Sequence, residues 1–75
     1  MTLAKAKTGV AYKVKALHTG DHEVEAFLFT LGCYVGEKVV VVSTISGSQT
    51  IAVRDGRYSI DRNLANAIEI EEVAQ

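Results

Sequence analysis

The chain has 75 residues, of which 48% are hydrophobic and 23% charged. A domain near this size buries only about 60% of its unfolded surface, so the length predicts a single domain over residues 1–75 with a simple core. The apolar content is too high for a disordered chain, and no apolar run approaches the roughly 18 residues that span a bilayer. We therefore expect a soluble globular domain that does not insert into a membrane.

Charge argues against a nucleic-acid partner. Eight Lys and Arg stand against nine Asp and Glu, for a net charge of -1, so the chain lacks the positive field that binds phosphate backbones. The charges are unevenly placed, with lysines near the start and glutamates near the end: Lys5, Lys7, Lys13, Lys15, Glu69, Glu71 and Glu72. If the first and last strands lie side by side, these two groups attract each other.

The first predicted element is a strand over residues 11–17. Its sequence, AYKVKAL, alternates apolar residues such as Tyr12 and Val14 with lysines, the period of two expected where one strand face is buried. The turn HTGD follows. Asp21 at its end can cap a helix by accepting hydrogen bonds from backbone N–H groups.

Residues 22–31 predict an amphipathic helix. Its apolar positions fall at i, i+3, i+4 and i+7 and form one face: Val24, Phe27, Leu28 and Leu31. Phe29 points roughly 100° or more away from that face, so we expect Phe27 in the core and Phe29 exposed. Gly32 can end the helix in the left-handed conformation, and Gly36 marks a second turn.

The remaining segments predict four more strands. The run over 38–44 contains four consecutive valines and is expected to be buried on both faces. Residues 49–54 and 57–60 flank Asp55-Gly56, a pair that can form a two-residue hairpin turn. Asp61 can then cap a short helical turn through Asn63 and Leu64, before a last strand over 67–71.

The order of elements indicates a mainly β fold: a small, partly open barrel of about five strands. One α-helix joins the first and second strands, and a short helical turn precedes the last. Hairpin connections rule out a parallel α/β sheet, and curling the sheet on itself hides its edges. We expect the helix to cover one mouth of the barrel.

Cys33, the single cysteine, lies in the segment LGCYVG over residues 31–36. It follows a helix C-terminus, whose partial negative charge opposes a thiolate, and no second cysteine stands nearby for zinc. We therefore expect a buried, unreactive side chain. One cysteine cannot form an internal disulfide, and the N-terminal residues lack the apolar core of a signal peptide, so a cytoplasmic protein is expected.

Metal binding and catalysis receive little support. His18, Asp21 and His22 are weak candidates for an Fe²⁺ or other divalent metal site, with Glu23 and Glu25 following. The helix is expected to begin between the two histidines, so they cannot share one helical face, and we predict a solvated loop and no cofactor. Catalytic triads, phosphate-binding glycine loops and paired carboxylates in a plausible cleft are not evident, which indicates that the protein is not an enzyme.

The run from LFTLG through VGEKVVVV resembles the bacterial ferrous iron transport protein A (FeoA) family. Its hallmark is a leucine–glycine helix end, a short turn and a valine-rich strand. The similarity extends along nearly the whole chain, from the Thr2-Leu3 start and Gly9 to the acidic end IDRNLANAIEIEE. The sequence departs from the family pattern at two positions. Val35 stands where the family usually has proline, and Thr8 stands where a proline often precedes the glycine, here Gly9.

The resemblance implies an SH3-like barrel, also found appended to iron-dependent repressors. It further implies a cytoplasmic accessory protein that binds the cytoplasmic part of FeoB, a GTP-hydrolysing membrane iron transporter, and is held by it at the inner face of the membrane. We expect the contact at Phe29, Tyr34 and Val35. The alternatives are a metal-sensing or metal-delivery module using His18, Asp21, His22 and Cys33, and a regulatory domain acting in trans like the repressor barrel. Self-association is a further option.

Overall fold

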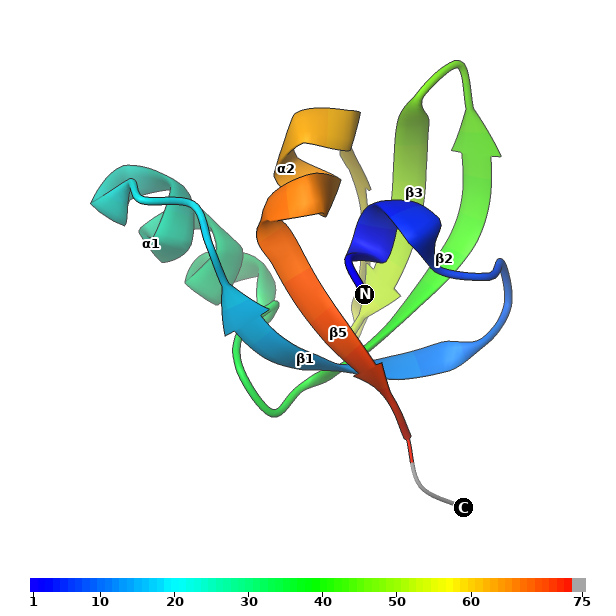
Figure 1. The fold of residues 1–75 in the computed structure, drawn as a ribbon, viewed down its shortest axis with the longest axis horizontal. Coiled ribbons are helices and arrows are strands. Elements are labelled where there is room, and N and C mark those ends of the chain that lie inside the picture. Colours follow the sequence, from blue (N-terminus) through cyan, green and yellow to red (C-terminus); the bar gives the residue numbers. More distant parts are fainter. Residues whose placement is uncertain (74–75) are drawn as a thin grey trace.

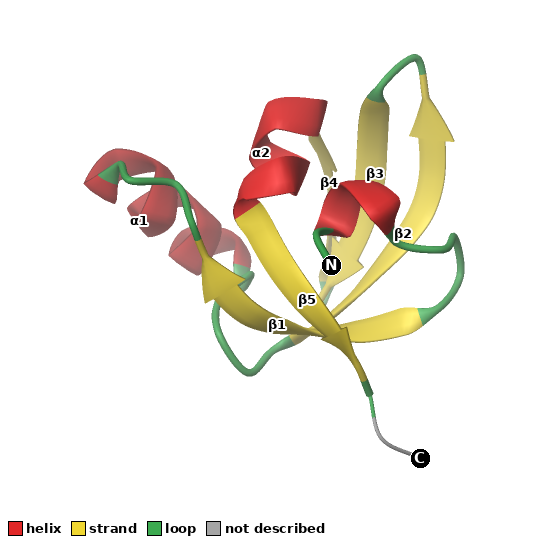
Figure 2. Cartoon of the chain, in the orientation of Figure 1, coloured by secondary structure: helices red, strands yellow, loops and turns green. Residues whose placement is uncertain are grey.

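The computed structural model describes residues 1–73, which form a mainly β fold (Figures 1 and 2). Within this range five antiparallel strands make one sheet in the order β4-β3-β2-β1-β5. The strands are β1 (Ala11–Leu17), β2 (Lys38–Ile45), β3 (Ser48–Val53), β4 (Gly56–Ile60) and β5 (Ile68–Glu72). The helical segments are the 3-10 helix η1 (Leu3–Lys5), α1 (His22–Leu31) and α2 (Arg62–Ala67). The predicted domain, 1–75, includes two residues, 74 and 75, that lie outside the described range.

The two neighbours of β1 overlap only at Tyr12 and Lys13, which lets the sheet curl along this strand. Its first residues pair with β2, and most of its length pairs with β5. Bulges between Val14 and Ala16 in β1, and between Val41 and Ser43 in β2, bend the strands and increase their twist. β4 and β5 remain the two edges, joined by α2, so the predicted partly open barrel is confirmed.

Alternate side chains of the strands fill one core. Its buried members from the sheet are Tyr12, Val14, Val39, Val41, Ile51, Val53, Ile60, Ile68 and Ile70. The prediction that the valine run is buried on both faces is wrong, because Val40 and Val42 are only half-buried. The sheet encloses a single core on one face, so the other face of β2 remains partly accessible to solvent.

The hairpin turn between β3 and β4 lies one residue earlier than predicted. Val53 pairs with Gly56, so the turn residues are Arg54 and Asp55, and Arg54 has a φ of 54°. Gly56 is required for space and not for a positive φ, because a Cβ at this position would collide with the hydroxyl of Tyr58.

The expected attraction between the basic start and the acidic end of the chain is confirmed. β1 and β5 are neighbours, with Lys13 opposite Glu71 in their ladder. Two residues further along each strand, Lys15 Nζ lies 3.5 Å from Glu69 Oε2. These exposed pairs favour the register, although each contributes little to stability.

The N-terminal residues form a structural element that the sequence did not predict. Leu3 in η1 is fully buried, and its carbonyl accepts a hydrogen bond of 3.1 Å from Nε2 of the buried Gln49. The backbone N–H of Ile70 donates to the carbonyl of Met1 at 2.8 Å. The start of the chain therefore packs on β5 and closes that side of the core.

Helix α1 has its predicted bounds, and three of the four residues of its predicted apolar face, Val24, Leu28 and Leu31, pack in or against the core. Asp21 Oδ1 accepts the backbone N–H of Glu23 at 2.9 Å, as expected for an N-cap. Leu28 is its one fully buried residue, while Phe27, predicted in the core, is 54% exposed. The reason is the position of the helix: it lies at one end of the molecule, beside the strands and not across them (Figure 1), and so reaches the core at few positions.

Helix α2 confirms the short helical element before the last strand and is longer than predicted. Asp61 Oδ1 accepts the N–H of Leu64 at 2.8 Å, and the helix continues to Ala67. Neither α1 nor the shorter helices of residues 1–73 combine the length and apolarity needed to cross a membrane.

Candidate interaction surfaces

The LGCYVG segment starts with a hydrogen-bonded helix end. Gly32 has a φ of 91°, and its N–H donates to the carbonyl of Phe29 at 3.0 Å. The next N–H, of Cys33, donates to the carbonyl of Leu28 at 2.8 Å. This pair of bonds is the Schellman motif. In this motif the two residues that correspond to Leu28 and Cys33 are often in apolar contact. Cys33 and Leu28 are both fully buried members of the core.

Burial determines the chemistry of Cys33. Removal of the thiol from water raises its pKa to about 11, because the charged thiolate is poorly solvated there. The thiolate is the form that attacks electrophiles and binds metals, so burial disfavours both roles for Cys33 near neutral pH. The prediction of a buried Cys33 is confirmed.

The side chains on either side of this helix end form an exposed apolar surface. The rings of Phe29 and Tyr34 lie 4.9 Å apart between centroids with a 30° interplanar angle, within the range of favourable aromatic pairs. Phe29 is 66% exposed and Val35 58% exposed. We refer to Phe29, Tyr34 and Val35 as the aromatic patch. All three were predicted as partner-binding residues, and the structure brings them to the same end of α1.

Arg54, in the β3–β4 turn, fixes the position of the aromatic patch. Its Nη1 donates to the Tyr34 hydroxyl at 2.7 Å and to Glu37 Oε1 at 3.1 Å. Gly32 makes room for this side chain, because a Cβ at Gly32 would collide with the methylene groups of Arg54. The sequence did not reveal this role, since nothing local places residue 54 beside residue 34.

A groove of about 630 Å³ lies between α1 and α2. Its apolar lining comes from the two helices, at Val24, Phe27, Leu64 and Ala67, and its polar lining comes from His18, Thr19, Asp21, Glu23, Asp61 and Asn63. The local sequence pattern predicts both helix caps in this set, Asp21 and Asp61, but not that the two helices face each other. The exposed Phe27 belongs to this groove and not to the aromatic patch.

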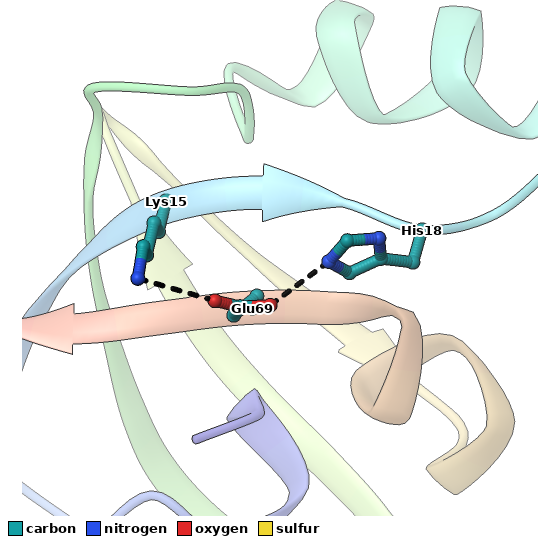
Figure 3. A network of polar contacts seen from close by, with 3 residues as sticks. All are labelled: Lys15, His18 and Glu69. Atoms are coloured by element: carbon teal, nitrogen blue, oxygen red, sulfur yellow. Dashed lines mark hydrogen bonds and ion pairs between the residues drawn. The ribbon is translucent and has the colours of Figure 1, made fainter.

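His18 takes part in a polar network with β5 (Figure 3). Its Nε2 lies 2.9 Å from Glu69 Oε1, while Lys15 Nζ approaches the other carboxylate oxygen. The hydrogen bond with His18, and then the charge of Lys15, hold the pKa of Glu69 below its ordinary value of 4.5. The network joins the C-terminal end of β1 to β5.

The three candidate metal ligands do not form a centre in the structure. Asp21 caps α1, His18 contacts Glu69, and His22 is exposed in the first turn of the helix. Across residues 1–73, His, Cys, Asp and Glu side chains form no group of three or more that could hold a metal ion. The candidates therefore remain separate residues with different contacts.

Comparison with known proteins gives the family. The sequence model of the FeoA domain matches residues 1–72. The chain belongs to the FeoA domain family. No curated protein sequence matches this FeoA domain.

Solved structures share its fold. Iron(II) transport protein A from Clostridium thermocellum superposes with a TM-score of 0.88 at 21% identity, covering 97% of this chain and 46% of that one. FeoA from Stenotrophomonas maltophilia, solved with zinc and described as an SH3 domain protein, gives 0.80 at 21% identity, covering 95% and 89%. A manganese-dependent transcriptional repressor gives 0.87 at 15% identity, covering 97% and 41%. The SH3-like fold is confirmed, and this FeoA domain spans less than half the length of the first and third proteins.

Proposed function

We propose that this FeoA domain is an accessory factor of bacterial ferrous iron uptake that binds the cytoplasmic part of a FeoB-type membrane GTPase transporter through the aromatic patch. Family membership supports the process, and the S. maltophilia FeoA has been described as a candidate activating factor of ferrous iron transport. The residues that would make the contact are Phe29, Tyr34 and Val35.

The observation that carries the proposal is an aromatic surface that is both exposed and fixed. Phe29 and Val35 leave more than half of their area accessible, yet Tyr34 is held by Phe29 on one side and by Arg54 on the other. Rigid aromatic side chains lose little conformational entropy on binding and commonly dominate interface energies. Phe29 is not among the buried core residues, and its exposed ring face is free to contact a partner.

Binding of the transporter's purified cytoplasmic domain tests the proposal. The double variant Phe29→Ala, Tyr34→Ala should weaken binding at least about tenfold, the effect expected when interface anchors are truncated. Ile45→Ala is the matched control, because Ile45 is 71% exposed on β2 and lies outside the aromatic patch. If the domain alters the rate of GTP hydrolysis by the transporter, the double variant should weaken that effect together with binding. Equal binding by a folded double variant would reject the aromatic patch as the contact.

A metal-dependent role is the second candidate, favoured by the zinc in the S. maltophilia FeoA structure. Anaerobic calorimetry with Fe²⁺ distinguishes the two functions. A stoichiometric Fe²⁺ site that disappears in His18→Ala would support metal sensing or delivery. Heat signals no larger than the heat of dilution would reject this second function.

A further inference from the structure

The groove between α1 and α2 combines negative charge with an apolar lining. Of its lining residues, three are carboxylates, Asp21, Glu23 and Asp61, and the one basic type is the imidazole of His18. Two helix N-termini contribute partial positive charges of about one half each, which offset only part of the negative charge. A cationic ligand is therefore favoured over an anionic one.

Two of these carboxylates are held in place by the fold. Asp21 and Asp61 each use Oδ1 to accept a backbone N–H at the start of a helix, at 2.9 and 2.8 Å. Within residues 1–73 their Oδ2 atoms make no hydrogen bond, so each can accept one from a ligand. Prepositioned acceptors lower the entropic cost of recognising a Lys or Arg side chain.

The apolar lining calls for a ligand with its own apolar side chains. Phe27, 54% exposed, and Val24 contribute from α1, while Leu64 and Ala67 contribute from α2. A large exposed aromatic beside further apolar residues is typical of a docking surface. The volume, about 630 Å³, is large enough to accommodate several side chains.

We propose that this groove is a second docking site, which takes a cationic amphipathic segment of a partner protein. Apolar anchors of the segment would contact the facing residues of α1 and α2, and its Lys or Arg residues would pair with Asp21, Glu23 and Asp61, as in helix-in-groove recognition. A divalent cation is a poorer match, since within the described residues the carboxylates do not gather into a metal-binding group. The inference does not rest on the transporter assigned above.

A designed peptide provides the probe. We would titrate ¹⁵N-labelled protein with an amphipathic peptide of about 14 residues that has leucine at helical i, i+3, i+4 and i+7 positions and lysine elsewhere. Saturable shifts should appear at the amides of α1, α2 and the β1–α1 loop. The same peptide with glutamate in place of lysine should bind at least about tenfold more weakly, because it meets like charge.

Two pairs of variants make the test specific. Phe27→Ala should weaken binding about tenfold, whereas Phe29→Ala, the same substitution on the same helix outside the groove, should leave it unchanged. Glu23→Lys should weaken binding of the peptide and reduce the salt dependence of that binding. Glu72→Lys makes the same change of charge outside the groove, on β5, and should have a much smaller effect. All four positions are exposed, and amide spectra verify that each variant is folded.

Several results would overturn the proposal. Absence of saturable binding, equal affinity in all four variants, or shifts centred on the aromatic patch would each reject the groove as the site. Shifts at the groove produced by Zn²⁺ or Mg²⁺ alone, and not by the peptide, would identify a cation site instead. The peptide assay contains no transporter, so its failure would leave the function proposed above standing, and loss of transporter binding in Phe29→Ala, Tyr34→Ala would leave the peptide result standing.

Discussion

Cys33 and Tyr34 are neighbours in the chain but occupy opposite environments. Cys33 is fully buried as part of the helix end, and Tyr34 turns outward to stack on Phe29 and accept a hydrogen bond from Arg54. Cys33, which has the reactive side chain, is therefore part of the core, whereas the half-buried ring of Tyr34 remains accessible at the surface.

Glu69 gives a pH dependence that can be measured. Its folded-state pKa lies below the ordinary 4.5, chiefly through the hydrogen bond with His18 and then the charge of Lys15. The ionised form therefore favours the folded state above about pH 4.5, and this contribution disappears as pH falls through the lower folded-state pKa. The stability difference between wild type and Glu69→Gln should shrink between about pH 6 and about pH 3 in urea unfolding.

Glu72→Gln is the control for this prediction. Within residues 1–73 its side chain makes no hydrogen bond or ion pair, so the same substitution on the same strand should have only a small effect on stability. A Glu69→Gln difference that stays constant over the same pH range would contradict the role of the His18 network.

At the scale of elements, α1 is held mainly at its two ends. Asp21 satisfies a backbone N–H at the start, the Schellman motif satisfies carbonyls at the end, and Leu28 anchors the middle. The helix has ten residues, too few to be stable alone in water. Its stability must therefore depend on these contacts, and on the packing of Val24 and Leu31 against the core, more than on its intrinsic helical propensity.

Gly32→Ala tests the helix end. Two effects add: the left-handed φ of 91° is unfavourable for alanine by about 1 kcal/mol, and the new Cβ would collide with the side chain of Arg54. We expect a total loss of at least about 2 kcal/mol in chemical unfolding. We also expect a weaker Arg54–Tyr34 contact, visible as a change in the Tyr34 ring resonances.

Gly20→Ala separates these two effects. Gly20 also has a positive φ, of 66°, but nothing lies within 4 Å of a Cβ built there. Its substitution should lose only about 1 kcal/mol. Equal losses at the two positions would show that the side chain of Arg54 yields without cost.

At the scale of the whole molecule, the first residues close the core against the last strand. Leu3 is fully buried, its carbonyl accepts from Gln49, and Met1 pairs with Ile70. The two ends of the described chain are therefore part of one packing unit. A change at residue 3 should affect the entire domain.

Leu3→Ala should lower the free energy of unfolding by about 2 to 4 kcal/mol, as expected for truncation of a fully buried leucine that leaves a cavity. Urea unfolding followed by circular dichroism measures it, with Ile45→Ala as a surface control that should change stability by less than about 0.5 kcal/mol. A loss at Leu3 no larger than that at Ile45 would mean that the N-terminal segment is not packed in solution.

The sequence predicted features that depend on local patterns and missed those that depend on distant neighbours. Alternation in β1, the cap at Asp21 and the stop at Gly32 are local, and all three agree with the structure. Phe27 was misplaced because helical periodicity defines a face but not how much of the helix meets the core. Arg54 and the groove were not predicted because residues brought together from separate elements leave no local signal.

Because Leu28 is the one fully buried residue of α1, exposed positions of this helix can differ in sequence without disturbing the core. Positions 27 and 29 lie on either side of this anchor, and neither is required to fill the core. Substitution at these two positions can therefore change the exposed surface of α1 while the core of the barrel stays unchanged. Structures that superpose on this chain with TM-scores of 0.80 to 0.88 share only 21% of its residues.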